Sequence, residues 1–195
     1  MGLLAQSRSE KHMIIQGIAS TCASCAQRRA QNLFVLGSRR VLELCVGPSL
    51  LVLRQAYSHF GIEVVGNDID PKWKNSCLIG DALTVSLAGF DTAVFAPPLS
   101  KSFSGRREDS LRISQVLPAY SRFLNRKDLT AIIVLVLPGR SFSTRQDRKE
   151  FYALLSILKY RFNVDYDALL DERGRVVKYV DVYLTKPQCI DQTKT

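Results

Sequence analysis

Apolar positions along the chain fall into short runs and longer periodic stretches that follow one another from about residue 38 to residue 187. Runs of strand length occupy 41–46, 62–66, 77–79, 91–95 and 130–137. Between them, apolar residues recur every three or four positions, as on one face of a helix, in 49–60, 109–124 and 143–158. Strands that alternate with helices predict an α/β fold with a mostly parallel sheet.

The two ends of the chain have patterns of their own. Residues 1–37 read as an N-terminal helical lead-in whose apolar stripe consists of Met13, Ile14, Ile18, Cys22, Cys25 and Ala26. Two further strands, 162–169 and 176–184, flank a turn at 171–174 and predict an antiparallel hairpin. Residues 188–195 form a polar tail, so the main domain is expected to span 38–187. Ser143, three residues before Gln146, predicts the N-cap of the last helix.

Composition indicates the cellular compartment in which the protein is expected. No apolar run approaches the ~20 residues of a membrane span, so no membrane association is expected. The N-terminus lacks an apolar signal core, and the five cysteines show no regular spacing. These features favour a cytoplasmic protein with reduced thiols. Cys22 and Cys25 fit small core residues better than a metal site, which needs about four ligands, and the two histidines suggest no catalytic or metal arrangement.

Charge adds a candidate partner. The net charge is +9, with +5 in residues 1–40, −3 in 43–100 and +5 in 101–127. Basic segments on both sides of an acidic middle predict a surface that attracts RNA or DNA. A solvated basic surface without a partner is the simpler alternative.

The chain is organised around the segment 40–50, in which a buried strand leads to a tight turn at Gly47-Pro48 and then to a helix. Backbone N–H groups at such a turn are expected to be free to bind an anion or a ligand carboxylate.

Acidic residues follow the next two strands. Asp68 lies about two dozen residues after the first strand, where a doubly wound fold places the acid that binds ribose hydroxyls. An ordinary Asx turn is the alternative. Gly80 and Asp81 end the third strand, and Asp81 is placed to accept a bond from an exocyclic amine, with Ala82 and Leu83 against a ring.

A stiff loop follows the fourth strand at Ala96, Pro97 and Pro98. Its two prolines force extended backbone at the carboxyl end of the strand, where such sheets carry their sites. After it come Lys101, Arg106 and Arg107 among serines and a glycine. This basic loop is a candidate for phosphate or carboxylate capture, and a plain solvated loop is equally consistent with it.

In this order, the motifs resemble those of the Rossmann-like (class I) S-adenosylmethionine-dependent methyltransferases. The segment 41–47 resembles the glycine-rich first motif, and the segment 80–82 resembles the adenine-binding turn. The segment 90–99 resembles a degenerate (Asn/Asp/Ser)-Pro-Pro-aromatic loop of enzymes that methylate amino groups. The resemblance covers about residues 38–186. It implies a three-layer fold with a seven-stranded sheet whose last strand is inserted antiparallel.

The resemblance implies S-adenosylmethionine as cofactor and assigns residues to it. Glu43, Cys45, Gly47 and Pro48 would frame the methionine end, Asp68 with Ile69 behind it would hold the ribose, and Asp81 with Ala82 would meet the adenine. Ala96, Pro97 and Pro98 would wall the methyl-transfer site, and Lys101, Arg106 and Arg107 would contact the substrate.

The implied activity is methyl transfer to a nucleic acid or a nucleic-acid-associated protein, with a partner subunit as a possible source of target recognition. Three alternatives stay open. They are a small-molecule methyltransferase with the basic loop as lid, a non-catalytic relative that binds cofactor or nucleic acid, and a nicotinamide-binding protein. The last is disfavoured because no G-x-G-x-x-G motif is present. Cys45 and Ser49 replace two family glycines, and Ala96 and Leu99 replace the polar residue and the aromatic of the proline loop.

Overall fold

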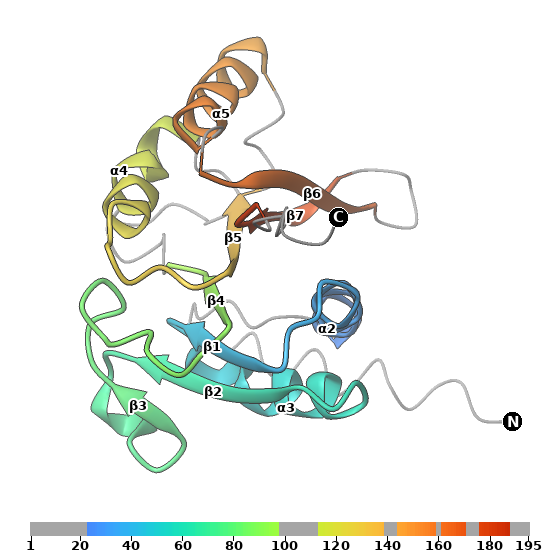
Figure 1. Ribbon diagram of the computed structural model, residues 1–195, viewed down its shortest axis with the longest axis vertical. Helices are drawn as coiled ribbons and strands as arrows, with labels where there is room; N and C mark the ends of the chain where they lie inside the picture. Colours follow the sequence, from blue (N-terminus) through green and yellow to red (C-terminus); the bar gives the residue numbers. More distant parts are fainter. Residues whose placement is uncertain (1–22, 98–112, 139–143, 159–160, 171–175, 188–195) are drawn as a thin grey trace, which may run out of the picture.

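The computed structural model describes residues 23–97, 113–138, 144–158, 161–170 and 176–187, which form one seven-stranded sheet in the order β3-β2-β1-β4-β5-β7-β6 (Figure 1). The strands are β1 (Arg40–Leu44), β2 (Glu63–Asp68), β3 (Cys77–Ile79), β4 (Thr92–Phe95), β5 (Ile132–Pro138), β6 (Asn163–Leu170) and β7 (Val176–Thr185). Neighbours from β3 through β5 pair in parallel. β7 pairs antiparallel with β5 and β6, which confirms the predicted fold class and the inserted last strand.

Helices cover both faces of the sheet. The helices are α2 (Ala23–Val35), α3 (Leu50–Ser58), α4 (Ile113–Leu124) and α5 (Arg145–Leu158), with short 3₁₀ turns at Gly47–Ser49 and Pro71–Trp73. α2 and α3 share one apolar cluster with one face of the sheet, while α4 and α5 share a second cluster with the other face (Figure 1). The sheet therefore lies between two helical layers. None of the helices in these described ranges is long and apolar enough to cross a membrane.

The centre of the sheet follows from its sequence. Side chains 132–137 of β5 are all buried, as expected for a continuous β-branched run with helices on both sides. β1 lies between β2 and β4, so the strand order reverses there. Ligands of open α/β sheets bind outside the carboxyl ends of the strands at such a reversal.

α2 packs as part of this core. Ala26, Ala30 and Leu33 are fully buried on the sheet. Arg29 on the same face is 4% exposed and donates to both carboxylate oxygens of Asp181 in β7, at 2.7 and 2.9 Å. An ion pair between distant segments therefore fixes α2 against the sheet. The rest of the predicted lead-in, up to residue 22, and the tail from residue 188 lie outside the described residues.

Two local predictions are wrong. Cys25 is half-buried and disulfide-bonded rather than reduced, and its partner lies outside the described residues because Cys45 and Cys77 are free thiols. The N-cap of α5 is Thr144, not Ser143. Its hydroxyl accepts the N–H of Asp147 at 3.0 Å and donates to that carboxylate at 2.6 Å. The hydroxyl of Thr144 therefore caps the helix one residue later than expected, and the Asp147 carboxylate orients that hydroxyl.

Candidate functional site

The turn after β1 is built from two residues with left-handed backbone. Cys45 has φ of +60° and Gly47 has φ of +48°. Gly47 and Pro48 open the 3₁₀ turn that leads directly into α3. Glycine adopts such angles without cost, whereas a side chain at Cys45 makes the same angle unfavourable. The chain thus keeps the sharp strand-to-helix turn of a glycine-rich motif with one glycine at its centre.

The carboxylate of Asp68 contacts this turn directly. Its Oδ2 accepts the N–H of Gly47 at 2.8 Å, and its Oδ1 accepts the N–H of Asp70 at 2.9 Å. The Val46 N–H is bonded to the carbonyl of Asn67 at 3.0 Å. The structure therefore brings the predicted glycine turn and the predicted ribose acid together. It also shows that the Gly47 N–H, expected to be free, is taken by Asp68.

Asp68 retains capacity for a ligand. A carboxylate offers about four lone-pair sites, and the two N–H bonds use two of them. Ile69, the next residue, is 66% exposed at the end of β2. The diol of a ribose needs two acceptors beside an apolar surface, so this strand end fits that group.

Asn67 is a residue of this region that the sequence analysis did not single out. It is fully buried, and its Nδ2 donates to the carbonyls of Leu78 at 3.1 Å and Gly80 at 3.0 Å. Its Oδ1 is buried without a hydrogen-bond partner among the described residues. An acceptor left in this state is costly, and a ligand donor is one way to satisfy it. The sequence feature that points to Asn67 is its position directly before Asp68.

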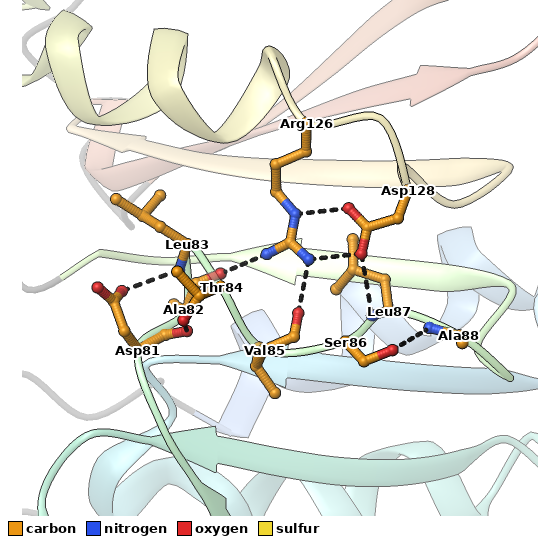
Figure 2. Close-up of polar contacts among 10 residues, drawn as sticks. All are labelled: Asp81, Ala82, Leu83, Thr84, Val85, Ser86, Leu87, Ala88, Arg126 and Asp128. Carbon is orange, nitrogen blue, oxygen red and sulfur yellow. Dashed lines mark hydrogen bonds and ion pairs between the residues drawn. The ribbon is translucent and has the colours of Figure 1, made fainter.

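Asp81 and Ala82 start the loop that joins β3 to β4. Asp81 is exposed, and its Oδ1 accepts the N–H of Leu83 at 2.9 Å. Ala82 is 6% exposed, and its carbonyl accepts a bond from Arg126 Nη1 at 2.9 Å (Figure 2). The predicted adenine turn is therefore ordered by a distant arginine, which no local pattern indicated.

The thiol of Cys45 lies in the field of both acids. Burial, together with the negative charges of Asp68 and Asp81, raises its pKa to about 12. Because a thiolate needs a nearby positive charge or solvent, Cys45 stays protonated and is no nucleophile at neutral pH. The effect of both negative charges on its pKa indicates that Cys45 lies near the two acids predicted to bind the ribose and the adenine.

Glu43 has a different environment. It is 2% exposed, and its Oε1 accepts the phenol of Tyr57 at 2.5 Å and lies 3.5 Å from Nη1 of Arg29. Burial raises the pKa of Glu43, while Arg29 opposes the shift. Glu43 therefore belongs to the polar cluster that also holds Asp181. Its role at the methionine end of a cofactor stays a prediction.

The proline loop is described only at its start. Ala96 and Pro97 are half-buried after β4. Since Leu44 pairs with Phe95, Ala96 leaves its strand at the same edge of the sheet as Cys45. The other members of the predicted site lie outside the described residues, namely Pro98, Lys101, Arg106 and Arg107.

Comparison with known proteins identifies this architecture. No family model matches the sequence, and no curated protein matches it. Solved structures do resemble it. The methyltransferase domain of bacterial CtHen1-C is 13% identical, with a TM-score of 0.55 over 84% of this chain and 97% of that one. An O-methyltransferase from Bacillus cereus, solved with SAH, is 14% identical, with a TM-score of 0.56 over 92% of this chain and 88% of that one.

A third structure is the 1,6-didemethyltoxoflavin-N1-methyltransferase of Burkholderia thailandensis, solved with 1,6-didemethyltoxoflavin and S-adenosylhomocysteine. It is 14% identical, with a TM-score of 0.50 over 83% of this chain and 78% of that one. Identities this low establish the fold and leave the residues of the site to be argued from their own geometry. The chain therefore has the Rossmann-like fold of these S-adenosylmethionine-dependent methyltransferases.

Proposed function

We propose that the protein binds S-adenosylmethionine at the carboxyl ends of β1, β2 and β4 and transfers its methyl group to an acceptor. The observation that carries this proposal is the bond between the Asp68 carboxylate and the Gly47 N–H. It brings a strand-end acid and the first βα turn together where the strand order reverses, which is where open α/β sheets bind their ligands.

Each binding residue has a distinct role in this proposal. Asp68 accepts the two ribose hydroxyls, with Ile69 as the apolar surface beside them. Asp81 accepts the exocyclic amine of the adenine, and Ala82 contacts its ring. Among the described residues, Oδ1 of Asp81 accepts the N–H of Leu83, and no hydrogen bond to Oδ2 of Asp81 is found. Cys45, Gly47 and Pro48 shape the methionine end, with Glu43 behind them.

Bound S-adenosylmethionine supplies an electrophilic methyl carbon on a positively charged sulfur. The chain contributes position rather than proton chemistry, since Ala96 has no side-chain acceptor. In this proposal Ala96, Pro97 and Pro98 would wall the methyl-transfer site, and the carbonyls of Ala96 and Pro97 would orient the acceptor. Orientation alone supplies a large part of the acceleration of an in-line displacement. With the cofactor bound, the acceptor's lone pair would form the new bond to the methyl carbon as the carbon–sulfur bond breaks. S-adenosylhomocysteine would leave with that electron pair, and the acceptor's proton would pass to water.

We propose a nucleic acid, or a protein associated with one, as the acceptor. The net charge of +9 and the basic segments 1–40 and 101–127 support this choice. Lys101, Arg106 and Arg107 would contact phosphates next to the proline loop, and a partner subunit would add target recognition. Binding to RNA or DNA oligonucleotides that weakens steeply between 50 and 200 mM salt is expected. Absence of such binding favours a small-molecule acceptor.

Calorimetric titration with S-adenosylmethionine and S-adenosylhomocysteine tests the cofactor. We expect micromolar binding to the wild-type protein and a loss of at least about tenfold in Asp68→Ala, because two hydrogen bonds to a charged group disappear. Asp68→Asn keeps one oxygen acceptor, which can still take the Gly47 N–H, so it reports on binding if Asp68→Ala unfolds.

Glu63→Gln is the matched control. It removes one negative charge from the opposite end of the same strand, where Glu63 pairs with Arg40 at the surface. Its affinity should equal that of the wild type. Failure of the folded wild-type protein to bind either ligand would defeat the proposal.

A non-catalytic relative of the fold is the second candidate. Ala96 in place of a polar residue, and side chains at two glycine positions of the first motif, favour it. Such a protein would bind S-adenosylhomocysteine normally and transfer no radiolabelled methyl group to RNA, DNA or protein.

A further inference from the structure

The loop between β3 and β4 has little structure of its own. The N–H groups of Thr84 and Val85 both bond to the carbonyl of Asp81 at 2.9 Å, which makes a single turn. Beyond it, Ser86, Ala88 and Gly89 are exposed, and Leu87 is the buried anchor. This loop carries the two residues assigned to the adenine, so a contact from outside the loop can decide how firmly they are held.

Arg126 supplies that support from another part of the chain. It follows α4, and its guanidinium points into the loop (Figure 2). Nη1 donates to the carbonyl of Ala82 at 2.9 Å, and Nη2 donates to that of Val85 at 2.5 Å. The side chain of Arg126 is 9% exposed. One planar group therefore holds two carbonyls of the turn 81–85.

Asp128 holds the guanidinium in this orientation. Its Oδ1 accepts from Nε of Arg126 at 2.8 Å, and its Oδ2 accepts from Nη2 at 2.6 Å. The same Oδ2 lies 3.4 Å from the N–H of Leu87 (Figure 2). The bond from Arg126 is the main cause that lowers the pKa of Asp128 to about 2, so the pair stays charged at neutral pH. Lysine cannot replace this arrangement because it lacks the planar set of donors.

We infer that Arg126 is a positioning residue that sets the preference of the proposed site for an adenine base, by fixing the turn that carries Asp81 and Ala82. This inference rests on the proposed function. The amine of adenine donates to a carboxylate, whereas the carbonyl at the same place in hypoxanthine would be repelled by it. A fixed Asp81 therefore discriminates between the two bases, and a mobile one does not.

The test compares the dissociation constants of S-adenosylhomocysteine and S-inosylhomocysteine by calorimetry. The wild-type protein should prefer the adenosyl ligand at least tenfold. In Arg126→Gln this ratio should fall at least threefold, toward the value that Asp81→Ala gives. A purely structural arginine would weaken both ligands by the same factor and leave the ratio unchanged, which would overturn the inference.

Lys186→Met is the matched control. Lys186 Nζ donates to the carbonyl of Leu129 at 2.6 Å, in the same connection between α4 and β5, and this bond does not involve the turn 81–85. Its base preference should match the wild type. If Arg126→Gln does not fold, Asp128→Asn keeps the arginine and loosens it, and a smaller fall in the ratio is expected. An unchanged ratio there would also overturn the inference. A folded wild-type protein that binds neither ligand overturns the proposed function itself, and this inference with it.

Discussion

At the scale of single residues, Cys45 shows how the turn after β1 forms with a side chain where the resembling family has a glycine. Its φ of +60° is a conformation that side chains adopt at a cost. The thiol is small enough to pack against the apolar cluster under α4 and α5. Cysteine thus permits the turn and also places a neutral group in the field of two acids.

Stability should fall at alkaline pH because of this thiol. Its pKa rises from 9.0 to about 12 on folding, so between these values the native state holds a proton that the unfolded state has lost. The free energy of unfolding should therefore decrease by about 1.4 kcal/mol per pH unit above pH 9, and this contribution is fully present below it. Urea unfolding at pH 8, 9, 10 and 11 measures the slope.

Cys45→Ala separates this contribution from those of the other titrating groups. The variant should show a shallower decline over the same range. Equal slopes in the two proteins would mean that folding does not raise the pKa of the Cys45 thiol.

At the scale of elements, the packing of β2 against α3 depends on a glycine. A Cβ at Gly66 would lie 2.8 Å from Cγ1 of Val46 and 3.0 Å from Cδ2 of Leu50. Val46 and Leu50 flank the turn that Asp68 contacts. Close approach of the strand to the turn therefore requires that position 66 carry no side chain.

Gly66→Ala should destabilise the protein by about 1–3 kcal/mol, because the added methyl overpacks this layer. Chemical denaturation measures the loss. Gly80→Ala is the control, since a Cβ there would meet Asn67 Nδ2 at 4.0 Å. Equal stability of Gly66→Ala and the wild type would show that the layer adapts.

The sequence predicts most of the helices and strands, for physical reasons. Period and length identified each strand of the parallel half, and Asp68 and Gly47 were found because strand ends carry turn residues. The sequence does not distinguish the two candidates for the N-cap of α5, because Ser143 and Thr144 both carry a hydroxyl. The N-cap is Thr144 because its hydroxyl bonds to Asp147, whereas the expected partner of Ser143 was Gln146. Asn67 was missed because its amide bonds depend on how β3 pairs with β2.

At the scale of the whole molecule, charged contacts between distant segments fix α2 and the β3–β4 loop. Arg29 and Asp181 are 152 positions apart, and Arg126 reaches carbonyls 44 and 41 positions away. Such contacts have no local pattern, so sequence reasoning treated residues 1–37 as a lead-in and gave Arg126 no role. These contacts form only when the order of the strands in the sheet brings the distant segments together.

Arg29→Met should destabilise the protein by about 3–5 kcal/mol, because it leaves Glu43 and Asp181 without their positive partner. Glu43 is 2% and Asp181 15% exposed, so water compensates little. Gln27→Met on the exposed side of the same helix is the control and should cost under about 1 kcal/mol. Similar thermal melting of the two variants would contradict this role of the cluster.

A crystal structure of the protein with S-adenosylhomocysteine tests the central claim most directly. The account predicts the ribose diol within hydrogen-bond distance of the Asp68 carboxylate and the adenine beside Asp81 and Ala82. A ligand bound elsewhere on the sheet, or none at saturating concentration, would contradict it.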